Sequence, residues 1–217
     1  MQGAPWPAGL LFGLSLALAI LLAGPLLLFS PWFTSALQER HGVAPSLATT
    51  QVEIDRVTGA MLFDLYVDGP FDASLDGEGP LLDKDERSHM SDVSRLVRLL
   101  AAITLVAVIL AAVMGAWLRG EPRRQGRIML LAAGGIGAAA LLLAVIFAVA
   151  FEPAFLVFHA IFFPPGTYLF EEGSELILLF PRGFWFDAAL AAGAVVVISA
   201  LVVTVLGLRR RRGPAEA

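Results

Sequence analysis

The sequence predicts an all-α integral membrane protein with four transmembrane helices, forming a single membrane domain over residues 1–217. Of the 217 residues, 58% are hydrophobic, and the mean hydropathy is +0.78, which is too apolar for a soluble domain of this size. Four apolar runs are long enough to cross a hydrocarbon core about 30 Å thick. They are residues 8–29, 96–118, 128–151 and 188–208. Each must be helical, because lipid offers no partner to an unpaired backbone polar group.

The first run, 8–29, is predicted to be a retained helix rather than a secretory signal. It lacks a basic flank, and it is longer than the apolar core of a cleaved signal. The chain contains no cysteine, which excludes disulfides, a thiolate nucleophile and a cysteine-ligated metal.

The distribution of charge predicts that both termini are cytoplasmic. Segment 119–127 carries four arginines against one acid, and four more arginines follow the last run at 209–212. The other two connecting segments hold 17 of the 19 acids. Because cytoplasmic segments are enriched in arginine and lysine, segments 30–92 and 152–187 are predicted to lie outside.

Segment 30–92 is too long for a simple connection and is predicted to form a small, helix-containing extracytoplasmic cap between the first two helices. Thr49, Thr50 and Glu53 suit the beginning of a helix. Apolar residues then recur at helical spacing, namely Val52, Ile54, Val57, Met61 and Leu65.

Segment 152–187 is predicted to be an aromatic extracytoplasmic loop. Residues 151–186 hold nine of the fifteen phenylalanines. Aromatic rings favour the headgroup level, which indicates an interfacial belt. The helix-breaking residues Pro164, Pro165 and Gly166 indicate instead a re-entrant segment packed on protein. Both interpretations stay open at this point.

Small residues in the third run predict close packing against a neighbouring helix. Gly134, Gly135, Ala138 and Ala139 form overlapping small-xxx-small patterns, which let helix backbones approach one another.

Two histidines are the candidate catalytic residues. His89 lies just before the second run and His159 just after the third, so both are predicted to reach the outer membrane face. Asp92 is three residues beyond His89 on one continuous helix, where it either orients the imidazole or pairs with Arg95. His159 is surrounded by phenylalanines, and a polar ring in such a setting is expensive unless it has a partner.

The remaining polar candidates are weaker. His41 has an ordinary loop context and is predicted to be structural. Arg95 flanks the outer mouth of the second run, where arginines snorkel towards headgroups or grip a phospholipid-like substrate. Glu152 and Asp187 lie at the ends of apolar runs as capping or interfacial residues, and Asp187 suits the start of a helix.

Two further interpretations stay open on the residues alone. His89, His159 and Asp92 make a two-histidine, one-carboxylate set for a hydrolytic zinc ion, as in a metal-dependent membrane hydrolase. Alternatively, the chain is a non-enzymatic membrane assembly protein with structural histidines. The chain has no Gly-x-Ser-x-Gly, His-Glu-x-x-His or phosphate-loop motif, which argues against a serine hydrolase. Nothing predicts a nucleic-acid partner.

Three short motifs together resemble a known family. They are His89-Met-Ser-Asp-Val93, Phe158-His-Ala-Ile-Phe-Phe163 and Phe180-Pro-x-x-Phe184. This combination is similar to the bacterial lipoprotein intramolecular transacylases, which are four-helix membrane proteins of about this length. The sequence departs from the family pattern at two places in segment 152–187. Tyr168 stands where a tryptophan is expected, and Pro164-Pro165 is unusual in this segment.

The resemblance implies a reaction, a substrate and a location. The enzyme is expected to be an acyltransferase that needs no cofactor or metal. It moves the sn-2 acyl chain of a diacylglyceryl-modified lipoprotein onto the α-amino group of the N-terminal cysteine, giving the lyso form. It works in the bacterial cytoplasmic membrane, among membrane lipids, with its site facing outside.

The resemblance also matches His89 and His159 to the two histidines on which activity depends. We expect His159 to act as the general base, because apolar surroundings keep an imidazole neutral. His89, with Asp92 nearby, is expected to be a cationic donor to the oxyanion. The substrate is expected to contact Arg95, Phe162, Phe163 and Tyr168.

Overall fold

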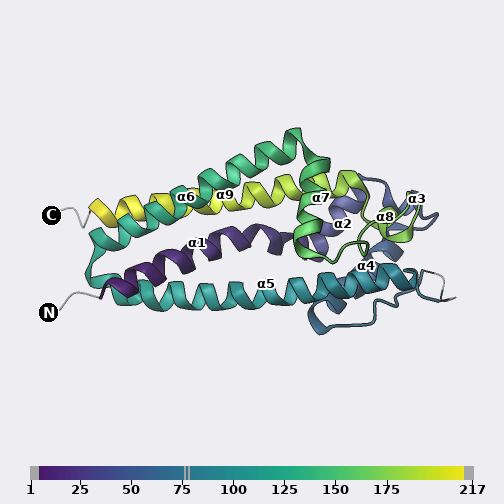
Figure 1. Ribbon diagram of the computed structural model, residues 1–217, viewed down its shortest axis with the longest axis horizontal. Helices are drawn as coiled ribbons and strands as arrows, with labels where there is room; N and C mark the ends of the chain where they lie inside the picture. The colour runs from purple at the N-terminus through teal and green to yellow at the C-terminus, as the bar shows by residue number, and fades with distance from the viewer. Residues whose placement is uncertain (1–4, 76, 78, 213–217) are drawn as a thin grey trace. The chain divides into compact units, whose positions relative to one another are not determined.

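The computed structural model describes residues 5–75, 77 and 79–212, and within them every regular element is a helix. This confirms the predicted fold class, including its four long apolar helices (Figure 1). The elements in chain order are α1 (Trp6–Leu28), α2 (Pro31–Arg40), α3 (Val43–Ser46), α4 (Gln51–Val67), α5 (Lys84–Trp117), the 3₁₀ turn η1 (Leu118–Gly120), α6 (Pro122–Val149), α7 (Phe151–Phe162), α8 (Glu175–Leu179) and α9 (Arg182–Arg212).

The four long apolar helices are α1, α5, α6 and α9. α5 contains 34 residues and is therefore roughly 50 Å long at 1.5 Å per residue. It exceeds the hydrocarbon thickness of about 30 Å and carries His89 on the same continuous helix as the apolar run, as predicted.

The third apolar run ends earlier than the sequence predicted. α6 ends at Val149, Ala150 leaves the helical conformation with φ −140° and ψ 47°, and α7 begins at Phe151. Pro153 supplies the reason, because its ring would clash with the carbonyl of Val149 in a continuous helix. In the first turn of a new helix the missing N–H does no harm.

The chain divides into two compact units, the first of which comprises residues 1–25, 101–145 and 191–217. Its buried apolar core consists of Ile20, Ala133, Ala140, Val196 and Ala200. These are mostly small residues, so the helix backbones approach closely.

Glycines at two helix contacts of this unit have no room for a side chain. A Cβ on Gly24 of α1 would lie 2.3 Å from the carbonyl oxygen of Ala192 on α9. A Cβ on Gly126 of α6 would lie 2.5 Å from the carbonyl oxygen of Gly207, also on α9.

The predicted packing role of Gly134 and Gly135 is wrong. A Cβ on either residue would meet no described atom within 4 Å, and Ala138 and Ala139 are exposed as well. The surface of α6 that packs inside carries Ala133, Gly137 and Ala140 instead. The small-residue motif is present, but the face that it marks is turned away from the core.

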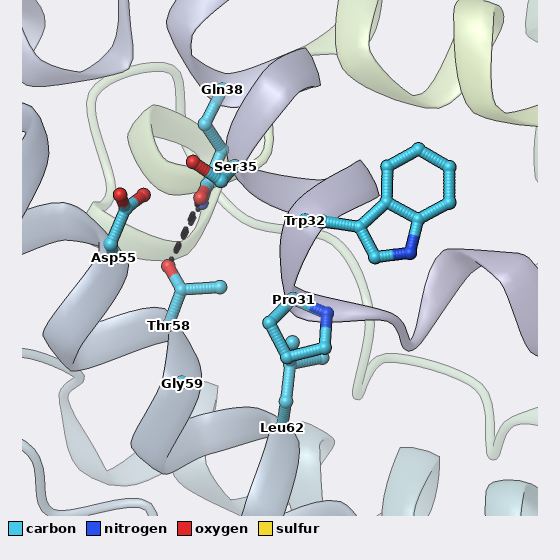
Figure 2. A pocket seen from close by; sticks show the side chains of 8 residues that line it. All are labelled: Pro31, Trp32, Ser35, Gln38, Asp55, Thr58, Gly59 and Leu62. Atoms are coloured by element: carbon cyan, nitrogen blue, oxygen red, sulfur yellow. Dashed lines mark hydrogen bonds between the residues drawn. The ribbon is translucent and has the colours of Figure 1, made fainter.

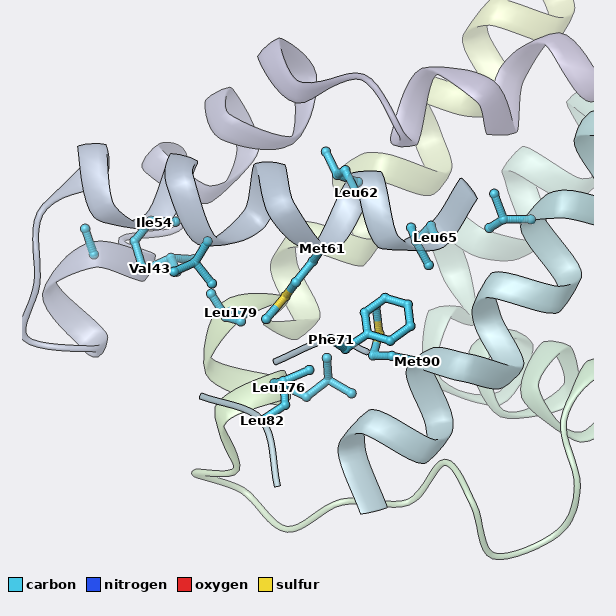
Figure 3. Packing of buried hydrophobic residues seen from close by; sticks show 13 residues of the cluster. Val43, Ile54, Met61, Leu62, Leu65, Phe71, Leu82, Met90, Leu176 and Leu179 are labelled. Carbon is cyan, nitrogen blue, oxygen red and sulfur yellow. The ribbon is translucent and has the colours of Figure 1, made fainter. Parts of the chain in front are cut away.

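The second unit comprises residues 26–100 and 146–190, and its main core is built around α4 (Figure 3). Ile54, Val57, Met61 and Leu65 are buried along one face of α4, and Val52 alone of the predicted stripe is exposed. The Thr50 hydroxyl accepts a hydrogen bond from the Glu53 backbone N–H at 3.3 Å, as expected for the beginning of this helix. The other buried members are Val43, Ala44, Leu62, Phe71, Leu82, Met90, Val97, Leu176 and Leu179.

α2 joins this core through a buried glutamine. The Gln38 side-chain amide donates to the Thr58 hydroxyl at 3.0 Å and to the Leu179 carbonyl at 3.1 Å, so α2, α4 and α8 share one polar contact. A hollow of about 240 Å³ opens beside it between α2 and α4, and Figure 2 shows the Gln38–Thr58 bond together with the residues that line it. Neither His89 nor His159 lines this hollow.

Candidate active site

The first turn of α5 is built by a reciprocal pair of caps. The Asp83 carboxylate accepts from the backbone N–H of Glu86 at 2.8 Å, and the Glu86 carboxylate accepts from the N–H of Asp83 at 2.9 Å. This arrangement satisfies N–H groups that have no partner within the helix. His89 follows one turn later and is 6% exposed.

α7 presents His159 to the interior through an i, i+4 stripe. Phe151, His159 and Phe163 are buried, with Phe155 partly buried between them. Residues four apart on a helix lie on one face, which explains why His159, 9% exposed, points inward. Most of the exposed side chains of α7 are apolar as well, among them Leu156, Val157, Ile161 and Phe162.

The two imidazoles are neighbours. The ring centroids of His89 and His159 are 6.1 Å apart, with an angle of 25° between the planes. The Phe163 ring contacts both imidazoles, at 4.9 Å from His89 and 5.4 Å from His159. The structure thus brings together two residues that are seventy positions apart in sequence.

Further aromatic rings complete a cage around the pair. Phe155 and Phe158 pack on His159 at 4.1 and 5.4 Å from within α7. The loop between α7 and α8, residues 163–174, contributes Tyr168 at 5.3 Å from His159 and Phe170 at 5.6 Å from His89. We call residues 163–174 the aromatic loop.

A backbone carbonyl selects the tautomer of His159. Its Nδ1 lies 2.8 Å from the carbonyl oxygen of Phe155, and a carbonyl can only accept, so Nδ1 carries the hydrogen. In the neutral ring, Nε2 then holds the free lone pair. Burial lowers the pKa of His159, and the bond to Phe155 opposes that shift. The arrangement therefore presents Nε2 as a base.

His89 differs from His159 in its hydrogen bonding. Its Nδ1 is buried and makes no hydrogen bond to any of the residues that the structure describes. A buried, unpaired ring nitrogen is costly, so we expect a substrate atom or a water molecule to complete its hydrogen bond.

The other predicted site residues divide into two groups. Phe163 and Tyr168 line the cage, whereas Phe162 is 47% exposed and no ring contact joins it to either imidazole among the described residues. Asp92 accepts a hydrogen bond from the Arg95 guanidinium. Of the two partners that the sequence allowed for Asp92, His89 and Arg95, the structure shows Arg95. Arg95, six residues beyond His89 on α5, is therefore paired with Asp92.

Sequence reasoning missed some of the residues around the pair. Phe155 and Phe158 were among the phenylalanines expected around His159, but the contact of Phe170 with His89 was not foreseen. Glu86 was also missed, although Asp83-x-x-Glu86 has the spacing of a capping box.

His41, which the sequence predicts to be structural, makes a side-chain contact with Asp187. Its Nε2 donates to the Asp187 carboxylate at 2.9 Å, and Arg40 pairs with the same oxygen at 3.2 Å. The pair borders a hollow of about 430 Å³ that Arg182 and Phe186 also line. Gly183 permits the contact, since a Cβ there would lie 2.6 Å from the His41 ring.

The metal-site interpretation requires three ligands in one place. Among the described residues, no group of three or more histidine, aspartate or glutamate side chains is arranged to hold a metal ion. Asp92, the third ligand of that hypothesis, pairs with Arg95 instead.

Comparison with known families gives a match over most of the chain. A family model described as lipoprotein intramolecular transacylase Lit matches residues 10–185. The chain belongs to the Lit family. Membership makes it an acyltransferase, as the three motifs predicted, and supports neither the hydrolase nor the assembly-protein alternative.

Solved structures show the same fold. The integral membrane lipoprotein intramolecular transacylase Lit from Bacillus cereus has a TM-score of 0.76 and 19% sequence identity, over 94% of this chain and 96% of that chain. Two variants of that protein, with one histidine replaced by arginine or by alanine, also have TM-scores of 0.76, at 18% identity over 94% of this chain and 91% or 92% of theirs. No curated protein sequence gives a match.

Proposed function

We propose that this chain moves the sn-2 acyl chain of a diacylglyceryl-modified, N-terminal cysteine onto the α-amino group of that cysteine. The product is an N-acyl, S-monoacylglyceryl lipoprotein. The observation that carries the proposal is a pair of buried, adjacent imidazoles, His89 and His159, in a member of the Lit family.

The reaction is an intramolecular aminolysis. The substrate's amine attacks the sn-2 ester carbonyl, a C–N bond forms, and a tetrahedral oxyanion results. The C–O bond to glycerol then breaks, and the proton lost by nitrogen is returned to the glyceryl oxygen. The nucleophile belongs to the substrate, so the enzyme needs no serine or cysteine of its own.

His159 is proposed as the general base. Its Nδ1 hydrogen is engaged by Phe155, which leaves Nε2 to accept the proton from the attacking nitrogen and to return it to the leaving oxygen. A positioned base of this kind contributes about 10²–10⁴-fold.

His89 is proposed as the donor to the oxyanion, but as a neutral imidazole rather than the cation that the sequence suggested, because burial disfavours the charged ring. A neutral imidazole carries one N–H, and Nδ1 of His89 has no hydrogen-bond partner among the described residues. One oxyanion donor contributes about 3–4 kcal/mol. Asp92 supports the region through Arg95 rather than through a bond to the imidazole.

The free-energy costs of the separate steps indicate which step the site must accelerate most. A free α-amino group has a pKa of about 7.7–8.0, so obtaining it neutral near pH 7 costs about 1 kcal/mol. Stabilising the oxyanion and releasing an alkoxide cost more. Holding amine and ester together in a water-poor cage supplies the proximity contribution.

The substrate contacts follow from the chemistry of the cage. Phe163 and Tyr168 present rings to the reacting region, and the exposed Phe162 lies with other apolar residues of α7 that suit acyl chains. Arg95 sits one turn and a half beyond His89 on α5, where its charge suits a lipid headgroup. The positive-inside bias supports an extracytoplasmic site in the bacterial cytoplasmic membrane, with both termini inside.

Expression in a host that makes only diacylglyceryl lipoprotein tests the proposal. Mass spectrometry of the lipidated N-terminal peptide should show one acyl group moved from glycerol to nitrogen. An unchanged diacylglyceryl peptide would contradict the proposed reaction.

Histidine variants test the two roles. Asparagine places an amide near Nδ1, so His159→Asn keeps the bond to Phe155 and loses the base; we expect a loss of about 10²-fold or more. His89→Ala, which removes every ring N–H, should also lose most activity. His41→Gln, which places an amide near Nε2 and so keeps a donor to Asp187, is the matched control and should retain it. Wild-type product formation by both site variants would refute the assignment.

A further inference from the structure

A buried carboxylate lies one turn before His89. Glu86 is 1% exposed, and both of its oxygens accept hydrogen bonds from backbone N–H groups. Oε2 accepts from Asp83 at 2.9 Å, and Oε1 accepts from Leu176 at 2.8 Å. A carboxylate survives burial only when such bonds satisfy it.

The two bonds join segments that are far apart in sequence. The Asp83 bond closes the capping box at the beginning of α5, and the Leu176 bond, 90 positions away, reaches the first turn of α8. A cap on α5 requires only one carboxylate oxygen. The second oxygen therefore serves the contact between α5 and α8.

α8 depends on outside support. With five residues it is too short to be stable alone, and Leu176 and Leu179 anchor it by burial in the core. The Glu86 bond supplies the polar part of that anchor. α8 immediately follows the aromatic loop, whose Phe163, Tyr168 and Phe170 contact the two imidazoles.

We infer that Glu86 is a positioning residue, whose carboxylate clamps α8 to the beginning of α5 and so holds the aromatic loop against His89 and His159. α7 fixes one end of the loop and the clamp fixes the other. Because His89 lies on α5 itself, one turn from Glu86, the clamp sets the loop's position relative to this imidazole. The catalytic consequence rests on the proposed acyl transfer, whereas the clamp itself does not.

Glu86→Leu is the discriminating change. Leucine has a similar size and no acceptor oxygen, so both the Asp83 bond and the Leu176 bond are lost. Glu53→Leu is the matched control, because Glu53 is also the third residue of a helix, α4, but is exposed and pairs only locally with Arg56. Asp83→Ala is a second control, because it removes the other half of the α5 cap and leaves the Leu176 bond.

Two readouts on the full-length protein in membranes test the clamp. In Glu86→Leu we expect faster hydrogen exchange in peptides covering 163–180, and kcat on a diacylglyceryl lipopeptide lower by about 10- to 100-fold with a smaller change in KM. Glu53→Leu should match the wild type in both. Asp83→Ala should raise exchange at the beginning of α5 and leave 163–180 protected.

Each contrary result has a distinct meaning. Wild-type exchange and kcat in Glu86→Leu would overturn the clamp, as would the same changes in Asp83→Ala, which would trace them to fraying of α5. If Glu86→Leu does not fold, Glu86→Ala serves instead, since it also removes both acceptor oxygens. A wild type without transacylase activity would defeat the proposed function, and hydrogen exchange would still decide on the clamp.

Discussion

The chemical state of His159 is decided by its own helix. The Phe155 carbonyl one turn earlier holds the Nδ1 hydrogen, while the phenylalanine rings on either side exclude water. The first effect leaves the free lone pair on Nε2, and the second disfavours the charged ring. A base that is neutral and correctly oriented before substrate arrives requires no rearrangement during the reaction.

This state predicts a particular pH profile. Burial lowers the pKa of His159 below its ordinary value of 6.5, whereas the substrate amine has a pKa of about 7.7–8.0. As pH falls from about 8, the amine protonates first, so log kcat/KM should fall with a slope of one. The slope should approach two only below 6.5, once His159 begins to gain a proton.

Initial rates on a diacylglyceryl lipopeptide, from mildly basic to mildly acidic pH, measure the profile. A return to the starting pH provides the control for irreversible loss of protein. A slope of two already at neutral pH would show that an imidazole with an ordinary or raised pKa must be deprotonated.

The pair of histidines could be predicted from sequence, but their local partners could not. Counting apolar runs brings His89 and His159 to one membrane face, because each run reverses the chain. The choice of Asp92 between His89 and Arg95 depends on side-chain rotamers within one helix turn, which spacing alone leaves undecided. The tautomer of His159 likewise follows from a backbone carbonyl that any sequence would supply.

At the level of elements, the aromatic loop is a wall of the site rather than a surface belt alone. Tyr168 and Phe170 reach the imidazoles from the loop, and Phe163 begins it beside both rings. The predicted interfacial role describes the exposed face of α7 better, where Leu156, Ile161 and Phe162 face outward.

Tyr168 tests whether the ring or the hydroxyl matters. Tyr168→Phe keeps the ring that packs on His159 at 5.3 Å, so we expect activity close to that of the wild type. Tyr168→Ala removes a contact between rings that is worth about 0.5–1.5 kcal/mol, and kcat should fall about 2- to 10-fold. Kinetics on the same lipopeptide distinguish the variants. If kcat falls by the same factor in Tyr168→Phe as in Tyr168→Ala, the hydroxyl and not the ring is responsible.

Helix boundaries show where sequence patterns reach their limit. The third apolar run was predicted to extend to residue 151, because the sequence stays apolar through the α6–α7 junction. The break at Ala150 comes from the backbone geometry that Pro153 imposes. A proline-based boundary would have found it, whereas hydropathy alone averages over it.

At the level of the whole molecule, each unit has its own means of cohesion. Residues 26–100 and 146–190 pack a core of large side chains such as Phe71 and Met61, and the other unit packs small residues at close backbone contacts. In lipid there is little hydrophobic gain from bringing apolar helices together, so close packing must supply the attraction.

Matched glycine variants test this packing. Gly24→Ala places a Cβ against the Ala192 carbonyl, and overpacking costs about 1–3 kcal/mol; we expect Tm to fall by about 2–10 °C. Gly134→Ala adds a Cβ that meets no described atom within 4 Å and should leave Tm unchanged or slightly raised. Thermal unfolding of both in the same detergent provides the measurement. Equal losses of Tm would contradict the assignment of faces, which the small-xxx-small pattern alone got wrong.

The distribution of arginines and acids between the connecting segments predicts the orientation of the chain in the membrane. Segment 119–127 is rich in arginine and the aromatic loop is acidic, so these two segments should lie on opposite sides. The chain has no cysteine, and Gly120 and Glu172 are exposed. Gly120→Cys and Glu172→Cys therefore report on one segment each without background labelling.

In intact cells that expose the outer face of the cytoplasmic membrane, a membrane-impermeant maleimide should label Glu172→Cys and spare Gly120→Cys. After permeabilisation both should react, which controls for reactivity of each thiol. The reverse pattern would place the histidine cage on the cytoplasmic side. It would separate the enzyme from a lipoprotein whose cysteine amine becomes free only after signal-peptide removal outside, so the orientation decides whether the proposed substrate can reach the site at all.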